Sequence, residues 1–440
     1  MKIYCTLPKS KILALPVTLS LWLCSSVSFA QSMSFEEQVT ELLQNHPRIK
    51  AATATVNSLE DGLRVAQKAW YPGLALIGSA AKEDRDNINP TDDTKLNSTE
   101  LKLTLTQPVY DFGSKAAAKT IARLQLDQAG KTLELTKQSI ILEIGAAQMG
   151  VAIAIEKLRY AKRSLSNLKK QTKLENIKVQ SGAGVSTDVL QAKVQLAGAK
   201  ARLLAAEGQL KTQENRYSAV FGELQNDFLK SRKLKLPVEG IPKTVDQALE
   251  TARKNNGQLR SLQDALSLAK ASLKQVKADQ IWPKIDFIAD KSFKKNVGGT
   301  RGRTEELSAK LQLTYNFNLG FSAVNNIGAA RSNYVAVQRQ LDDARRLIDE
   351  GVSNAFIGYE QSLENAKLLA EQAALSAAFL KLARKERKLG KRSLLEILSG
   401  ETAVINARSD AAEAEGARVS TALALLSAMG TLEPQHLKLQ

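Results

Sequence analysis

The chain has 440 residues, of which 43% are hydrophobic and 24% are charged, and its formal net charge is +17. Its two cysteines, Cys5 and Cys24, lie near the N-terminus, and its two histidines, His46 and His436, lie far apart. This composition excludes a disulfide framework and a cysteine or histidine metal site in the body of the chain, while the positive charge raises nucleic acid or an anionic membrane as partners.

Residues 1–30 have the features of a secretory signal peptide. Three lysines precede an apolar run over residues 12–24, and a small-x-small cleavage site ends at Ala30. The run is shorter than the roughly 20 residues of a membrane-spanning helix. We expect cleavage after Ala30 and export from the cytoplasm, which argues against nucleic acid as a partner. Acylation at Cys24 is the alternative processing.

The rest of the chain contains two similar halves that are about 208 residues apart. Residues 34–51 align with residues 244–261, and the sequence SGAGVSTDVL aligns with LGKRSLLEIL. We therefore expect a first repeat over residues 31–231 and a second repeat, with a C-terminal tail, over residues 232–440.

Each repeat contains one pair of strand-like segments, in hairpins over residues 72–110 and 283–319. In the second hairpin the odd positions from Leu307 to Leu319 are apolar and the positions between them are polar, which predicts a two-faced strand. A soluble sheet satisfies this alternation too. However, an isolated hairpin is marginal in water, and a tilted strand crosses a bilayer in about 9 to 11 residues. Unpaired strand edges in a membrane then require assembly with further chains.

A long helix pair follows each hairpin. Residues 114–180 contain no proline and carry an apolar stripe with coiled-coil spacing, and a returning helix over residues 186–221 completes the pair at 114–221. The second repeat has a similar pair over residues 320–430. No segment after the signal peptide approaches 18 consecutive apolar residues, so we expect no transmembrane helix.

Together these segments resemble the TolC-type outer-membrane efflux protein family over residues 34–437. The resemblance is carried by the aromatic-proline entries Tyr71-Pro72 and Trp282-Pro283, the hairpin exits QPVYDFG and NFNLG, and the turn motifs SGAGVSTDVLQAK and LGKRSLLEILSGE. It implies a mostly helical α+β membrane protein. Twelve strands, four from each chain of a homotrimer, would form one outer-membrane β-barrel continuous with a long periplasmic α-helical barrel. A girdle would include residues 226–242 and the C-terminal tail.

The resemblance also implies a passive channel of a tripartite export system, not an enzyme, with no cofactor. Its partners would be a periplasmic adaptor (membrane fusion) protein, an inner-membrane ABC or proton-driven transporter, and outer-membrane lipid. The turn sequence GKRSLLEIL resembles the branch that serves type I protein secretion, which we prefer. Multidrug efflux is the alternative. A periplasmic coiled-coil scaffold is a candidate from a different class, and it predicts a protein that needs no detergent.

By the same resemblance, the helix breaks near Gly182 and Gly390 are periplasmic tips. Arg392 is expected to reach Asp188 or Thr187 as a gate latch, whereas an exposed pair of this kind contributes only about 0–1 kcal/mol if it has no such role. Basic residues gather before both tips, where they suit either helix C-termini or an acidic adaptor surface. The remaining expected site residues are Glu396 and Ser399 at the pore constriction, and Gly182, Val185, Gly390, Ser393 and Leu394 as adaptor-docking contacts.

Overall fold

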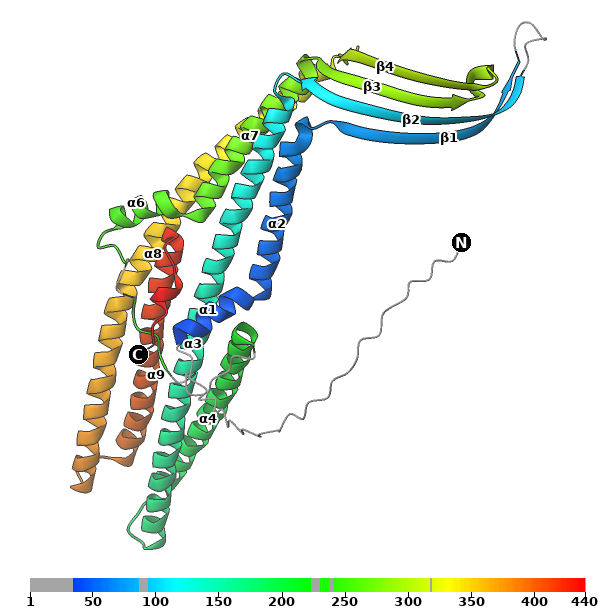
Figure 1. Ribbon diagram of the computed structural model, residues 1–440. Helices are drawn as coiled ribbons and strands as arrows, with labels where there is room; N and C mark the ends of the chain where they lie inside the picture. The colour runs from blue at the N-terminus through cyan, green and yellow to red at the C-terminus, as the bar shows by residue number, and fades with distance from the viewer. Residues whose placement is uncertain are drawn as a thin grey trace, which may run out of the picture. The chain divides into compact units, whose positions relative to one another are not determined.

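In the computed structural model, the same order of helices and strands occurs twice along the chain (Figure 1). The first round consists of α1 (Phe35–Asn45), α2 (Pro47–Gln67), β1 (Gly73–Arg85), β2 (Thr94–Tyr110), α3 (Ser114–Gln180) and α4 (Ser186–Phe221). The second consists of α6 (Val245–Asn255), α7 (Gly257–Ile281), β3 (Lys284–Lys295), β4 (Arg303–Thr314), α8 (Ser322–Lys388) and α9 (Leu394–Met429). Helices α3 and α8 have 67 residues each, and α4 and α9 have 36 each. The predicted duplication is therefore confirmed at the level of whole elements.

The structure describes most of the chain, as residues 35–86, 94–222, 230, 232–237, 240–316 and 319–439. The predicted signal peptide and its acylation site lie outside these ranges. Residues Phe35–Gln440, which contain both repeats, form one compact unit.

The four strands form one antiparallel sheet in the order β1-β2-β3-β4, so the hairpins of the two repeats pair through β2 and β3. The prediction of a strand reaching Leu319 is wrong, because β4 ends at Thr314. Thr314 lies opposite Lys284, the first residue of β3. Pro283 precedes Lys284 and has no backbone N–H to continue the ladder, so β4 loses its partner there.

One face of this sheet is apolar and exposed. Leu76 in β1, Leu103 in β2 and Leu311 in β4 are 66%, 37% and 68% exposed. On the other face, the Thr104 hydroxyl donates a hydrogen bond to Asp290 at 2.6 Å, and Lys102 pairs with the same carboxylate at 3.3 Å. This is the reverse of a soluble sheet, which buries its apolar face, and it matches strands that face lipid with apolar side chains and a water-filled interior with polar ones.

The hydrophobic core lies where α1, α6 and the C-terminal end of α9 meet the middle of α3. Val39, Ile144, Tyr217, Phe356 and Leu426 are buried members of this cluster. The C-terminal tail closes it, since Leu439 forms an isolated antiparallel bridge with Leu234 and the Lys235 N–H donates to the Lys438 carbonyl at 2.6 Å. The described part of the expected girdle, residues 232–237, therefore pairs with the tail, while residues 223–229 lie outside the described ranges.

Helix α3 contains a stretch that is long and apolar enough, by length and composition alone, to cross a membrane. A little over half of its apolar window is buried inside the molecule. Ile140, Ile144 and Val151 on this helix belong to the core cluster, so its apolarity is explained by packing.

Candidate functional site

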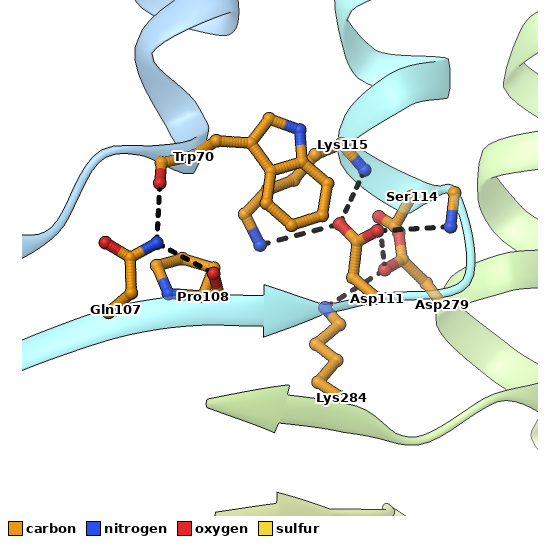
Figure 2. A network of polar contacts seen from close by, with 9 residues as sticks. Trp70, Gln107, Pro108, Asp111, Ser114, Lys115, Asp279 and Lys284 are labelled. Atoms are coloured by element: carbon orange, nitrogen blue, oxygen red, sulfur yellow. Dashed lines mark hydrogen bonds and ion pairs between the residues drawn. The ribbon is translucent and has the colours of Figure 1, made fainter. Parts of the chain in front are cut away.

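The strand–helix junction of the first repeat is built around a buried carboxylate (Figure 2). Asp111 is 3% exposed and accepts hydrogen bonds from the Gly113 N–H at 3.1 Å and the Lys115 N–H at 2.8 Å. The Lys115 ammonium lies 5.3 Å from the ring centroid of Trp70. The Trp70 carbonyl in turn accepts a hydrogen bond from the Gln107 side chain at 2.8 Å. Asp111 thus satisfies the free N–H groups at the start of α3 and fixes how the helix leaves the sheet.

The same junction ties the two repeats together. The Ser114 hydroxyl donates to Asp279 of α7 at 2.8 Å, and Asp279 pairs with Lys284 of β3 at 3.0 Å (Figure 2). Phe112, just before α3, has a φ of +52° and stacks on Trp282 with ring centroids 4.9 Å apart. Phe321 has the same φ just before α8. Both repeats therefore turn from strand to helix through a left-handed aromatic residue, a conformation that is costly for a bulky side chain and is held by its surroundings.

The two helical tips have the same backbone design. Gly182 and Gly390 have φ values of +75° and +74°, which glycine adopts readily. The Ala183 N–H donates to the Lys178 carbonyl at 2.9 Å, and the Lys391 N–H donates to the Glu386 carbonyl at 3.0 Å. These bonds are the Schellman motif, which satisfies the last carbonyls of α3 and α8 and reverses the chain sharply.

Helix α9 starts with a capping box that uses one of the expected pore residues. The Ser393 side chain accepts a hydrogen bond from the Glu396 N–H, and the Glu396 carboxylate accepts one from the Ser393 N–H, both at 3.3 Å. Glu396 and Ser399 are both exposed. Glu396 therefore has a structural role that the sequence analysis did not assign, and its carboxylate still faces solvent.

Arg392 makes its contacts within its own tip. Its Nε lies 2.7 Å from Glu386, its Nη1 lies 3.6 Å from Glu396, and its guanidinium lies 5.4 Å from the Phe379 ring centroid. The hydrogen bond to Glu386 raises the pKa of Arg392. Among the described residues, the structure does not bring Arg392 to Asp188 or Thr187, because Glu386 on the same helix pair takes the guanidinium.

One expected docking residue is corrected by the structure. Leu394 is only 2% exposed and packs in a cluster with Leu168 and Leu398, so it holds α9 against α3 and presents no surface to a partner. The exposed apolar side chains are its neighbours Leu395, at 49%, and Leu389, at 72%. The sequence could not tell which leucine of the pair at 394 and 395 points inward. The other expected docking residues, Gly182, Val185, Gly390 and Ser393, are exposed.

Sequence reasoning also missed a buried ion pair between the hairpins. Glu175 of α3 is 3% exposed and lies 2.8 Å from Arg387 of α8 and 3.2 Å from Lys178. Burial opposes ionisation of Glu175, but hydrogen bonds from Arg387 and Lys178 outweigh it and hold its pKa below the ordinary value. Part of the basic cluster before the tips therefore joins the two hairpins.

The described part of the chain contains no group of three or more histidine, cysteine, aspartate or glutamate side chains that could hold a metal ion. Long helical hairpins joined to a sheet with an exposed apolar face are the features of a membrane protein subunit whose strands face lipid.

Comparisons with known proteins agree with this class. The outer membrane efflux protein family matches residues 39–223 and 248–431. The chain is 23% identical to outer membrane protein TolC of Escherichia coli (strain K12), over 96% of this chain and 87% of that one. It is 22% identical to outer membrane efflux protein BepC of Brucella suis biovar 1 (strain 1330), over 93% and 88%. The solved outer-membrane channel OprN is similar with a TM-score of 0.79, at 21% identity over 90% of each chain.

The chain belongs to the outer membrane efflux protein family. It is an outer-membrane channel protein with a periplasmic helical extension, and it is not an enzyme. Its structural neighbours are trimeric channels, so the sheet in Figure 1 is the part of the barrel that one subunit contributes. Channels of this family are homotrimers that work with periplasmic adaptors and inner-membrane transporters.

Proposed function

We propose that the chain forms the passive exit duct of a tripartite exporter and that its helical tips receive cargo from a periplasmic adaptor and an energised transporter in the inner membrane. The observation that carries this proposal is the surface of the tips. Val185, Leu389 and Leu395 expose apolar side chains beside two rigid glycine turns. Exposed apolar side chains that are surrounded by polar residues are typical of surfaces that bind another protein.

Type I protein secretion is the proposed task, because the turn sequence GKRSLLEIL forms the second tip and resembles that branch of the family. Multidrug efflux is the second candidate, since BepC, a relative matched over most of both chains, is named an efflux protein. The transporter is an ABC protein in the first case and a proton-driven pump in the second.

The narrow end of the duct is proposed as a gate. Arg392 holds the tip of α8 and α9 through Glu386 and Glu396, and Glu396 and Ser399 are exposed one turn apart on α9. A link from Arg392 to Asp188 or Thr187 remains a prediction for the assembled channel, in which three copies of these tips meet.

The experiment that tests the task is deletion of the gene in its host, followed by complementation. Under type I secretion, the deletion abolishes export of a large protein and leaves drug susceptibility nearly unchanged. Increased susceptibility with intact protein export would overturn the secretion assignment and support efflux.

Tip docking is tested in the same host with Leu389→Ser combined with Leu395→Ser. The matched control is Leu204→Ser, an exposed leucine on α4 that is 71% exposed. We expect the tip variant to reduce export and adaptor co-purification by roughly tenfold, because a few central apolar contacts carry most of the binding energy of an interface. Equal loss in the control variant would contradict a docking role.

A further inference from the structure

A small cationic pocket lies between α3, α8 and α9, near the tips but separate from the residues assigned to docking or gating. Its volume is about 280 Å³. Its lining comes from one face of each helix, since it uses positions 160, 163, 164 and 167 of α3, positions 377, 380, 381 and 384 of α8, and positions 401, 404, 405 and 408 of α9. All of its lining residues in this structure come from one chain.

The charge of this pocket is unbalanced. Arg163, Lys381, Arg384 and Arg408 line it, whereas Glu401 is its one acidic residue. Glu401 is already paired with Arg384, and its other oxygen lies 3.4 Å from the Asn167 amide. Arg163, Lys381 and Arg408 have no ion pair within the part of the chain that the structure describes. Arg163 and Lys381 are exposed and Arg408 is half-buried, so cations from three different helices line one pocket whose single carboxylate is already paired with Arg384.

A buried polar group in the same wall also lacks a partner. Ser164 is 6% exposed and lines the pocket, and its hydroxyl oxygen makes no hydrogen bond to any described residue. A buried hydroxyl without a partner costs free energy comparable to a lost hydrogen bond. The wall of the pocket therefore holds an unpartnered hydroxyl as well as positive charge, and an oxyanion that drew the Ser164 side chain toward the pocket would satisfy both.

We propose that this pocket binds a small oxyanion of the phosphate or carboxylate class. Arginine guanidinium groups bind such oxygens through paired, charge-assisted hydrogen bonds, and the Ser164 hydroxyl supplies a further donor. The volume lies just below the roughly 300–1,000 Å³ typical of sites for larger ligands, so the pocket suits a small anion and not transported cargo.

A bound anion would bridge helices that otherwise present like charges to one another. Arg163 belongs to α3, Lys381 to α8 and Arg408 to α9, so one oxyanion can contact both helical hairpins. A ligand that binds only this arrangement stabilises it by mass action. The anion therefore stabilises the packing of the two hairpins just before their tips.

The test is isothermal titration calorimetry of the purified full chain in detergent. Inorganic phosphate is the titrant, and the starting buffer contains no phosphate and little salt. We expect saturable binding in the wild type and a roughly tenfold weaker affinity in Arg408→Gln, because one charge-assisted contact is lost. Ser164→Ala retains the charge and leaves only a small cavity, and it is expected to weaken binding several-fold. Lys367→Gln, a change to an exposed lysine of α8, is the matched charge control and should bind like the wild type.

A thermal melt of the same four proteins with and without phosphate supplies a second measurement. Phosphate should raise the melting temperature of the wild type and Lys367→Gln more than that of the two pocket variants. Absence of saturable wild-type binding, or equal weakening by Lys367→Gln and Arg408→Gln, would overturn the proposal. Since binding and melting require no transport, this result is independent of the proposed function.

Discussion

At the scale of single residues, the ion pair of Glu175 and Arg387 joins α3 to α8 close to their tips. The folded-state pKa of Glu175 lies below its ordinary value of 4.5, so the pair contributes its full stability above about pH 4.5 and loses it as the pH falls through the folded-state pKa. We expect Glu175→Gln to cost roughly 3 kcal/mol locally, because it leaves the largely buried Arg387 without its counter-charge.

Hydrogen exchange of the tip segments measures this effect. In Glu175→Gln at neutral pH, amides at the ends of α3 and α8 should exchange faster, and acidification of the wild type should likewise lower their protection once the slower intrinsic exchange at low pH is divided out. Glu364→Gln removes an exposed carboxylate of α8 that is 63% exposed and pairs with Lys367 at 3.8 Å, so it serves as the control. Exchange that is equally slow in wild type and Glu175→Gln would contradict the role of the pair.

Two adjacent leucines at the start of α9 offer a matched comparison of packing. Leu394→Ala should destabilise the tip by about 2–5 kcal/mol, because it leaves a cavity between α9 and α3. Leu395→Ala should change stability by less than about 0.5 kcal/mol, because that side chain is half exposed. Limited proteolysis at the tip and thermal melting check both values. Similar losses in the two variants would show that the assignment of inner and outer leucine is wrong.

At the scale of elements, the sheet places its apolar face outward. Leu311→Lys puts a charge on that face of β4, which costs about 2–4 kcal/mol at the middle of a bilayer, whereas Gln312→Lys puts the same charge on the polar face one residue away. We expect Leu311→Lys to lower the amount of protein in outer-membrane fractions several-fold and Gln312→Lys to leave it near the wild-type level. The opposite order would reverse the assignment of the two faces.

The lengths of the elements could be predicted from sequence because local signals mark their ends. Glycines in left-handed conformations end α3 and α8 near Gly182 and Gly390, and regular apolar spacing marks the helices between. The end of β4 at Thr314 could not be predicted from its own alternation, since it depends on where β3 loses its partner N–H groups. The contacts of Glu175 and the burial of Leu394 were also missed, because both arise where helices far apart in sequence meet.

At the scale of the whole molecule, four strands per chain leave the edges of β1 and β4 without a strand partner among the described residues. Backbone groups on such edges must be satisfied in a bilayer, which only closure with further subunits provides. In the trimeric channels to which this chain is related, three subunits together supply twelve strands, so each sheet edge pairs with an edge of the next subunit. The tips are then repeated three times around one axis, so the Glu396 carboxylate of α9 occurs three times and forms a ring of negative charge.

Single-channel conductance in a planar bilayer tests this assembled state. The wild type is expected to pass small, cation-selective currents. Arg392→Ser should increase the current, because the side chain that joins Glu386 and Glu396 at the tip is removed. Glu396→Gln should abolish most of the cation preference while keeping the capping bond to Ser393, since glutamine can replace glutamate in a capping box.

Ser399→Asp provides the converse change, because it adds a carboxylate one turn further along α9 and should strengthen the cation preference. If none of these changes alters the current or its selectivity, the constriction lies elsewhere in the duct and the tips act only in docking. A protein that stays soluble without detergent and never inserts would instead support the periplasmic scaffold. The exposed apolar face of the sheet argues against that outcome, because a soluble scaffold would have to leave Leu76, Leu103 and Leu311 in contact with water.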